Sequence, residues 1–255
     1  MAVKYSFIIL KAQSEENESL DPYIDLLQKK GYEVHFVPTL QFEYHNLDVL
    51  KKKLNQPMNY SGLVLTSPRC LRGVMKSLKN DKLDENWHQK PIFVVGETTS
   101  RLVVNELNQE PVGAYSGNAM SLIPILSKYE LTKPLLAPCG NLNLNILSDN
   151  LKSIKLENVE VYRTISHSNL ENNLRTTLDQ IHNEIGLIFF SPSGFQASIK
   201  LIPENYLKKI VLFSIGPTTA SAIKQAGYIL SGICDKPKPE SMLDMIDNYM
   251  KCQVL

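Results

Sequence analysis

The sequence predicts an α/β protein built from two similar domains. Runs rich in Val, Ile, Leu and Phe alternate with stretches of helical spacing, which is typical of a parallel sheet covered by helices on both faces. The second observation is an internal repeat: Ser67-Pro68 precedes a Gly-x-Thr-Thr run at Gly96, and Ser191-Pro192 precedes another at Gly216. The copies lie about 120 residues apart, far beyond the roughly 20–50 residues of a solenoid unit, so two domains are the simpler explanation.

The repeat covers other segments as well. An apolar run opens each half, at Phe7–Leu10 and at Leu135–Ala137, and each is followed by a second β-type run. We align these second runs as Tyr32–Val37 with Val159–Ile165. The strands that we expect, in chain order, are Tyr5–Leu10, Val34–Val37, Gly62–Thr66, Ile92–Gly96, Leu135–Pro138, Val159–Thr164, Leu187–Ser191 and Ile210–Ile215. A helix before Gly31 is expected to end at that glycine.

Composition excludes several classes of function. The net charge of +1, with both signs mixed along the chain, argues against nucleic-acid binding through a basic stripe. The one compact basic run, Lys51-Lys52-Lys53, is expected on a solvated helix face. The first apolar stretch, Tyr5–Leu10, is too short for a signal peptide or a membrane span, so we expect a cytoplasmic protein without membrane contact. The cysteines, which lack C-x-x-C spacing, are expected to be buried structural residues: Cys70, Cys139, Cys234 and Cys252.

The repeated motifs fall where a parallel sheet binds ligands, beyond the carboxyl ends of strands. A helix begins after each of these motifs, and we call such a connection from a strand to a helix a corner. The free backbone N–H groups and the positive dipole end of the helix favour the binding of a carboxylate or a phosphate. For any single corner, helix capping alone is the simpler explanation. Four corners, together with Pro138-Cys139-Gly140-Asn141, favour a polyanionic ligand.

Common catalytic motifs are missing from the sequence. It has no G-x-G-x-x-G after a strand, no G-x-x-x-x-G-K-[ST], no H-E-x-x-H and no G-x-S-x-G, and its histidines lack metal-ligand spacing. We therefore expect no metal and no cofactor, which leaves cofactor-free chemistry or binding alone.

The chain resembles the uroporphyrinogen-III synthase family, and its animal members most closely. The order and spacing of the matching motifs are specific, although each motif is short. They are Asp21-Pro22-Tyr23, residues 62–69, Val94-Val95-Gly96, residues 138–141, Val161-Tyr162-Arg163-Thr164, residues 189–194 and residues 215–220.

The resemblance implies two similar parallel-sheet α/β domains joined by a two-stranded linker. The first domain would comprise residues 1–33 and 166–255, the second residues 41–158, and the connecting strands residues 34–40 and 159–165. Without the resemblance, the residues do not distinguish this wiring from two consecutive domains divided near residue 130.

The resemblance also implies a reaction. The family's substrate, hydroxymethylbilane, is a linear tetrapyrrole with eight carboxylates that loses its terminal hydroxyl and closes to uroporphyrinogen III. Ring D is inverted through an azafulvene and a spiro intermediate. The implied protein is a cofactor-free lyase of haem biosynthesis that acts as a monomer on this small molecule. Such chemistry depends mainly on positioning, which fits a sequence without a nucleophile and base constellation.

Tyr162 matches the tyrosine that the family places near its active-site cleft, where a phenol can assist hydroxyl departure. Without the resemblance, a strand tyrosine packed on the sheet is the simpler explanation. The same correspondence implies substrate contacts from Ser67, Arg69, Thr99, Ser191, Ser193, Gly194, Thr218 and Thr219. Thr218 and Thr219 match best, whereas Glu97 beside the other corner would repel a carboxylate if it faced the ligand.

Two rival interpretations use the same corners. One is a non-catalytic two-domain protein that binds a small polycarboxylate or a phosphorylated ligand, and it has no need of a hydroxyl donor. The other is a catalytically inactive relative of the synthases.

Overall fold

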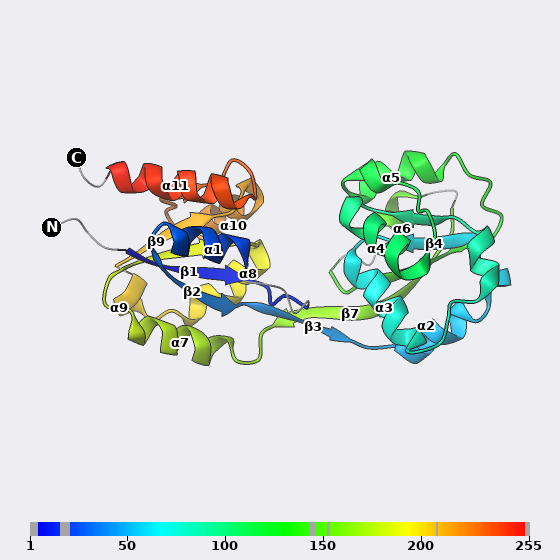
Figure 1. The fold of residues 1–255 in the computed structure, drawn as a ribbon, viewed down its shortest axis with the longest axis horizontal. Coiled ribbons are helices and arrows are strands. Elements are labelled where there is room, and N and C mark those ends of the chain that lie inside the picture. Colours follow the sequence, from blue (N-terminus) through cyan, green and yellow to red (C-terminus); the bar gives the residue numbers. More distant parts are fainter. Residues whose placement is uncertain (1–4, 16–20, 143–145, 152–153, 208, 253–255) are drawn as a thin grey trace. The chain divides into compact units, whose positions relative to one another are not determined.

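The chain folds into two compact units. A computed structural model describes residues 5–15, 21–142, 146–151, 154–207 and 209–252. Unit 1 comprises Met1–Gln41 with Ile165–Leu255, and unit 2 comprises Phe42–Thr164. The boundaries fall inside β3 (Leu40–Tyr44) and β7 (Leu156–Ser166), so two strands carry the chain from one unit to the other (Figure 1). This division is discontinuous in sequence, unlike a cut near residue 130.

Unit 1 contains a five-stranded sheet in the order β10-β9-β8-β1-β2, in which all neighbouring strands run parallel. Two helices, α1 and α11, pack on one face, and α7, α8 and α10 pack on the other. The strands are β1 (Tyr5–Lys11), β2 (Glu33–Pro38), β8 (Glu184–Phe189), β9 (Ile210–Ser214) and β10 (Gly232–Ile233). The helices are α1 (Pro22–Lys29), α7 (Leu170–Gln180), α8 (Pro192–Ser198), α9 (Glu204–Leu207), α10 (Pro217–Gln225) and α11 (Pro239–Cys252).

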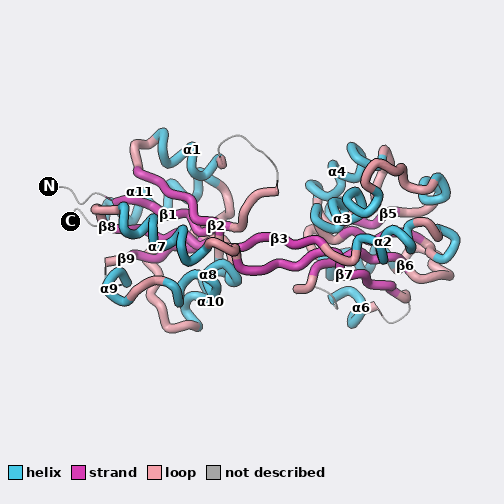
Figure 2. The backbone as a smooth tube through the Cα atoms, turned by 90° about the horizontal axis from the view of Figure 1, so that it is seen from below, coloured by secondary structure: helices cyan, strands magenta, loops and turns pink. Residues whose placement is uncertain are grey.

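Unit 2 also contains a five-stranded sheet, in the order β3-β7-β6-β4-β5, in which the pairs β7-β6, β6-β4 and β4-β5 run parallel. One face is covered by α2, α3 and α4, and the other by α5 and α6, so each unit has three layers (Figure 2). The remaining strands are β4 (Gly62–Leu65), β5 (Ile92–Val94) and β6 (Leu135–Gly140). The helices are α2 (Leu47–Leu54), α3 (Pro68–Leu78), α4 (Glu97–Leu107), α5 (Ala119–Leu126) and α6 (Ile146–Asn150). Short 3₁₀ turns lie at Pro57–Asn59, Glu85–Gln89, Ala114–Ser116 and Ile199–Leu201.

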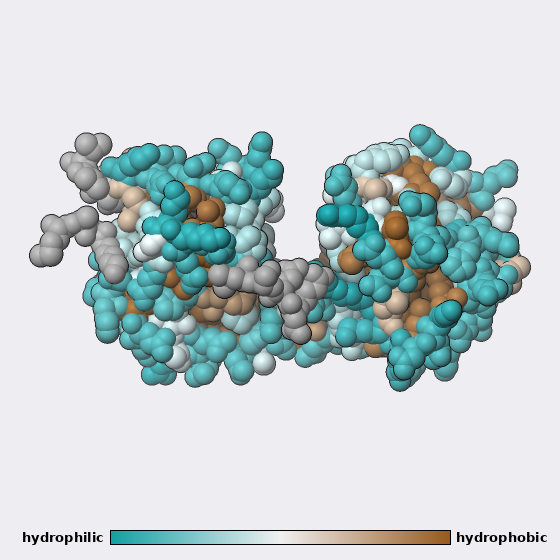
Figure 3. Space-filling model, in the orientation of Figure 1, coloured by the Kyte–Doolittle hydropathy of each residue, from teal (hydrophilic) through white to brown (hydrophobic). Residues whose placement is uncertain are grey.

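The cores form on both faces of each sheet. β1, β4 and β6 are buried along nearly their whole length, as continuously apolar strands of a covered parallel sheet should be. The visible face of each unit is mostly hydrophilic, with smaller hydrophobic areas between the polar side chains (Figure 3). Among the helices that the structure describes, none combines the length and apolar character needed to cross a bilayer.

The predicted strands are present, but β4 and β9 end one residue earlier than expected, and two others end two residues earlier. β5 ends at Val94 rather than Gly96, and β8 at Phe189 rather than Ser191, because Gly96 and Ser191 are the N-caps of the following helices. α1 stops before Gly31, whose φ of 85° suits glycine, as predicted. Of the cysteines, Cys252 is exposed, contrary to our expectation, because it lies on the last turn of α11.

Strand pairing corrects our alignment of the two halves. Gly62, Leu135 and Leu156 form one row across the sheet of unit 2, and Gly186, Phe7 and Val34 form the corresponding row in unit 1. Val34 is therefore the counterpart of Leu156, and the predicted match of Tyr32–Val37 with Val159–Ile165 is wrong by five residues. Both runs contain a Glu-Val pair, at Glu33-Val34 and at Glu160-Val161. So short a pattern does not determine which residues of the two halves are equivalent, whereas the hydrogen bonds between strands do.

Backbone hydrogen bonds confirm the corrected equivalence. His167 N donates to Thr39 O in unit 1 (3.0 Å), and His45 N donates to Val161 O in unit 2 (3.1 Å). Gln13 N likewise donates to Leu40 O (2.9 Å), and Asn141 N donates to Tyr162 O (3.2 Å). Thr39 and Leu40 of unit 1 thus correspond to Val161 and Tyr162 of unit 2.

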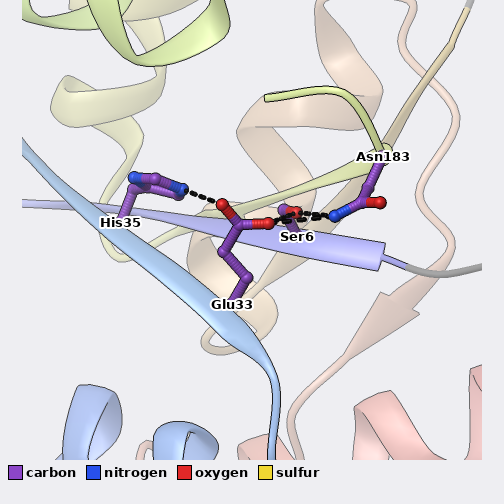
Figure 4. A network of polar contacts seen from close by, with 4 residues as sticks. All are labelled: Ser6, Glu33, His35 and Asn183. Carbon is purple, nitrogen blue, oxygen red and sulfur yellow. Dashed lines mark hydrogen bonds and ion pairs between the residues drawn. The ribbon is translucent and has the colours of Figure 1, made fainter. Parts of the chain in front are cut away.

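A cluster of polar side chains lies at the amino-terminal ends of β1, β2 and β8 in unit 1 (Figure 4). Glu33 Oε2 accepts hydrogen bonds from Ser6 Oγ (2.5 Å) and Asn183 Nδ2 (2.9 Å), and Glu33 Oε1 lies 3.2 Å from His35 Nε2. Asn183 Nδ2 also donates to Ser6 Oγ (2.8 Å). Because Ser6 is completely buried, these bonds satisfy a hydroxyl that would otherwise destabilise the sheet.

Candidate active site

A pocket of about 310 Å³ lies within unit 2, at the carboxyl end of its sheet. Ligands of parallel α/β sheets bind at this edge, because the loops after the strands converge there. The wall combines the end of β6 with the loops that follow β4 and β5, the start of α5, one residue of α6 and two residues of β7. These residues include Thr66, Ser67, Val95, Asn118, Pro138, Cys139, Gly140 and Tyr162.

Tyr162 contributes a half-buried phenol to this wall. Its hydroxyl lies 3.4 Å from Ser67 Oγ, and its ring contacts the rings of Phe42 (centroids 6.4 Å apart) and Tyr44 (6.2 Å). Burial raises the pKa of Tyr162 above its ordinary value, and the neighbouring Cys70 adds to this, while the Ser67 hydrogen bond and the Arg69 charge act in the opposite direction. The phenol is therefore protonated at neutral pH and has a proton to donate.

Ser67 precedes α3, but its side chain does not cap that helix. Its hydroxyl instead lies 3.3 Å from Cys70 Sγ and 3.4 Å from the Tyr162 hydroxyl. The corresponding hydroxyl of unit 1, Ser191 Oγ, accepts a hydrogen bond from Gly194 N (3.0 Å) and caps α8 in the expected way. The serine hydroxyl of the Ser-Pro motif thus contacts the Tyr162 phenol in unit 2, whereas in unit 1 it caps a helix.

Arg69 is held next to this pocket by an aromatic ring. Its guanidinium carbon lies 3.4 Å from the centroid of the Phe42 ring, and on the same helix Lys76 Nζ lies 5.0 Å from the Tyr44 ring centroid. Stacking on a ring orients the planar guanidinium, which can then bind a carboxylate through two parallel hydrogen bonds. Arg69 does not itself line the pocket.

Cys139 is the sulfur-bearing residue of the pocket wall. Burial raises the pKa of the Cys139 thiol to about 12, with a further contribution from Cys70. The thiol is therefore neutral at physiological pH and a poor nucleophile. Within the described parts of the chain, no three His, Cys, Asp or Glu side chains are grouped as a metal site would require.

The two Gly-x-Thr-Thr corners bury one threonine each. Thr99 is 1% exposed and Thr219 is 3% exposed, so their side chains belong to the cores and only their backbones can face a ligand. Thr218 and Glu97 are exposed. Thr98, the counterpart of Thr218 in the other corner, is exposed as well.

The predicted site residues therefore fall into two sets. The structure brings Ser67, Arg69 and Tyr162 together in unit 2. In unit 1, Ser191 and Ser193 lie at the carboxyl end of β8 with their hydroxyls 3.4 Å apart, next to the buried Gly194, and Thr218 follows β9. Asn118 and Gly140 of the pocket wall were not predicted as site residues, because a cap and a strand glycine carry no specific chemical signal.

Comparison with known proteins decides the family. The family model for uroporphyrinogen-III synthase HemD matches residues 21–244. The chain belongs to the uroporphyrinogen-III synthase family. Uroporphyrinogen-III synthase of Schizosaccharomyces pombe is 28% identical over 249 residues, which cover 94% of this chain and 95% of the relative. The Saccharomyces cerevisiae synthase is 24% identical, with 91% and 93% covered.

Solved structures of the family share the fold. Uroporphyrinogen-III synthetase from Helicobacter pylori aligns with a TM-score of 0.66 at 19% identity, covering 96% of this chain and 99% of that one. A mutant synthase from Thermus thermophilus aligns with a TM-score of 0.62 at 15% identity, with 96% and 99% covered. The two-domain α/β architecture is thus that of the family, and membership makes the protein an enzyme of tetrapyrrole synthesis. The particular resemblance to animal members stays a prediction.

Proposed function

We propose that this protein is a uroporphyrinogen-III synthase that converts hydroxymethylbilane into uroporphyrinogen III, and that Tyr162 is its catalytic residue. The observation that carries this proposal is the protonated Tyr162 phenol on the wall of the unit 2 pocket, beside the Ser67 hydroxyl. A non-catalytic binder would have no use for such a donor, and the family relationship does not favour it.

Tyr162 acts when the carbon–oxygen bond of the substrate's terminal hydroxymethyl group breaks. The pyrrole nitrogen pushes electrons into the ring and the phenol gives its proton to the departing hydroxyl, so that water, a phenolate and a positively charged azafulvene that keeps its N–H proton result. When the final ring closure restores a neutral pyrrole, the proton lost from its carbon returns to the phenolate. General-acid help of this kind contributes about 10²–10⁴-fold to the rate.

The carboxylates of the substrate bind to helix N-termini and to Arg69. The α10 corner offers backbone N–H groups and the exposed Thr218, and the α8 corner offers Ser193. Each helix end contributes roughly 0.3–1 kcal/mol toward an anion, and several together hold a flexible polyacid without a strongly basic surface. Ser191 and Gly194 shape the α8 corner, while Thr99 and Thr219 contribute through their backbones.

The other expectations complete the proposal. The enzyme is a lyase that uses no cofactor, acts as a monomer in the cytoplasm and takes a small-molecule substrate rather than nucleic acid. Support for these statements comes from the sequence, which lacks cofactor and metal motifs and has a net charge of +1. Sedimentation equilibrium of the purified protein tests the monomer.

Product analysis tests the function directly. Hydroxymethylbilane made enzymatically is incubated with the protein, the products are oxidised, and the type I and type III isomers are separated. We expect type III to dominate, because spontaneous closure without ring inversion gives type I. Type I alone at every protein concentration would contradict the proposal.

A further inference from the structure

Gly140, at the end of β6, lies directly beneath the Tyr162 ring. A Cβ atom built on Gly140 would stand 2.7 Å from the Tyr162 hydroxyl oxygen and 2.6 Å from ring carbon Cε2, where ordinary contacts are 3.4–4 Å. The φ angle of Gly140 is not among the positive values that favour glycine. Glycine is therefore required at this position for space rather than for backbone conformation.

A local irregularity in the sheet brings the two residues together. Cys139 pairs with Glu160, but the next residue, Gly140, pairs with Tyr162, so Val161 is an extra residue on β7. An extra residue of this kind bends a strand and redirects the side chains beside it. Just beyond β1 and β2 in unit 1, the hydrogen bonds from Thr39 N to Lys11 O and from Gln13 N to Leu40 O skip one residue in the same way, so both units share this backbone path and differ in the side chains on it.

Unit 1 provides an internal comparison for this pair. The hydrogen bond from Gln13 N to Leu40 O matches that from Asn141 N to Tyr162 O, so Leu40 corresponds to Tyr162. The residue before Gln13 is Ala12, where unit 2 has Gly140. The copy without a phenol therefore carries a side chain at this position, and the copy with a phenol carries none.

We propose that Gly140 is a positioning residue for Tyr162: because it lacks a Cβ atom, the phenol can lie across the end of β6, with its hydroxyl beside Ser67 and facing the pocket. This inference rests on the proposed catalytic role of Tyr162. An alanine at position 140 would displace the ring by roughly 1 Å, a displacement that can cost about 10²-fold in rate when it affects a reacting group.

The first test is Gly140→Ala in the full-length protein. We expect kcat for type III product to fall roughly 10–100-fold while KM changes less than about threefold, because the substrate-binding corners are untouched. A readout independent of activity is the pKa of the Tyr162 phenol, measured by NMR on tyrosine labelled at Cζ and assigned with Tyr162→Phe. We expect this pKa to fall toward its ordinary value in Gly140→Ala, because the displaced ring is less buried.

Gly186→Ala is the matched control. Gly186 is a strand glycine of unit 1 that also lies under a ring, since a Cβ there would stand 2.5 Å from Phe7 Cδ1. This variant should lose stability but keep the Tyr162 pKa and the kcat of the folded fraction. An unchanged Tyr162 pKa in Gly140→Ala, or an equal loss of kcat in Gly186→Ala, would overturn the inference.

Two further variants keep the test decisive. If Gly140→Ala does not fold, Gly140→Ala combined with Tyr162→Ala should recover the melting temperature of Tyr162→Ala alone, since the clash is with the ring. Failure to recover it would overturn the inference. If Tyr162→Phe keeps full kcat while Gly140→Ala still shifts the phenol pKa, the catalytic role of Tyr162 fails but the positioning by Gly140 holds.

Discussion

Ser67 and Ser191 occupy equivalent corners of the two units, yet their hydroxyls have different partners. Ser191 Oγ accepts from the backbone of α8, whereas Ser67 Oγ contacts the Tyr162 phenol and Cys70. The duplicated fold therefore repeats the helix ends that can bind anions, but it does not repeat the proton donor. The two corners are similar in sequence because they share a backbone fold. What each serine hydroxyl can do depends on the side chains around it.

The strongest test of this asymmetry is Tyr162→Phe. We expect kcat for type III product to fall about 10²–10⁴-fold with little change in KM, because only the proton donor is removed. Steady-state kinetics with isomer separation measures the effect. Tyr206→Phe is the control, because Tyr206 is a unit 1 tyrosine that donates to Asp179, and its kcat should equal that of the unchanged protein.

Arg69→Gln should have the next largest effect. Loss of a charged hydrogen-bond donor to a substrate carboxylate should raise KM about tenfold, in line with roughly 1.5 kcal/mol for such a bond. Arg69→Lys should not restore KM, because an ammonium lacks the planar group that stacks on Phe42. Full restoration by lysine would show that charge alone matters and that the stacking does not.

Comparing Ser67→Ala with Ser191→Ala separates the two corners. Ser191→Ala removes a helix cap and should cost about 1 kcal/mol in the free energy of unfolding, measured by urea denaturation. Ser67→Ala removes no cap, so its stability loss should be smaller, while kcat should fall about fivefold because one hydrogen bond to the phenol is worth roughly 1 kcal/mol. The reverse pattern would show that both serines act alike.

The smallest expected effect concerns acid stability. The Ser6 hydrogen bond, with further help from His35 and Asn183, lowers the pKa of Glu33 below 4.5 in the folded protein. A lowered folded pKa contributes stability that is present above pH 4.5 and is lost as the pH falls through the folded value. The melting temperature of Glu33→Gln should therefore depend less on pH between about 5 and 3 than that of the unchanged protein. Identical pH profiles would contradict this.

Sequence alone predicted the elements of the fold better than their register. Continuous apolar runs identified the buried strands, but β3 has a mixed pattern and β10 has two residues, so neither was predicted. The helix ends were recognisable from Ser-Pro and Gly-x-Thr-Thr. The correspondence of Leu40 with Tyr162 depends on hydrogen bonds between segments far apart in the chain, which no local pattern encodes.

The site was predicted in part for the same reason. Tyr162, Ser67 and Arg69 were selected through the family resemblance, and the structure places them close together. The burial of Thr99 was missed, although Thr99 and Val103 are four residues apart on one face of α4 and helical periodicity could have shown it. The requirement for glycine at position 140 depends on where the Tyr162 ring lies, which the sequence does not reveal.

The discontinuous course of the chain has a consequence for synthesis on the ribosome. Unit 2 is continuous from Phe42 to Thr164 and can fold as soon as it emerges, but β1 lies between β2 and β8, and β8 is translated much later. At about 5–20 residues per second, the roughly 170 residues between β1 and β8 take on the order of 10–30 s to translate. During that time the apolar strand Phe7–Leu10 lacks its partner β8, so nascent chains should depend on chaperones that shield extended apolar segments.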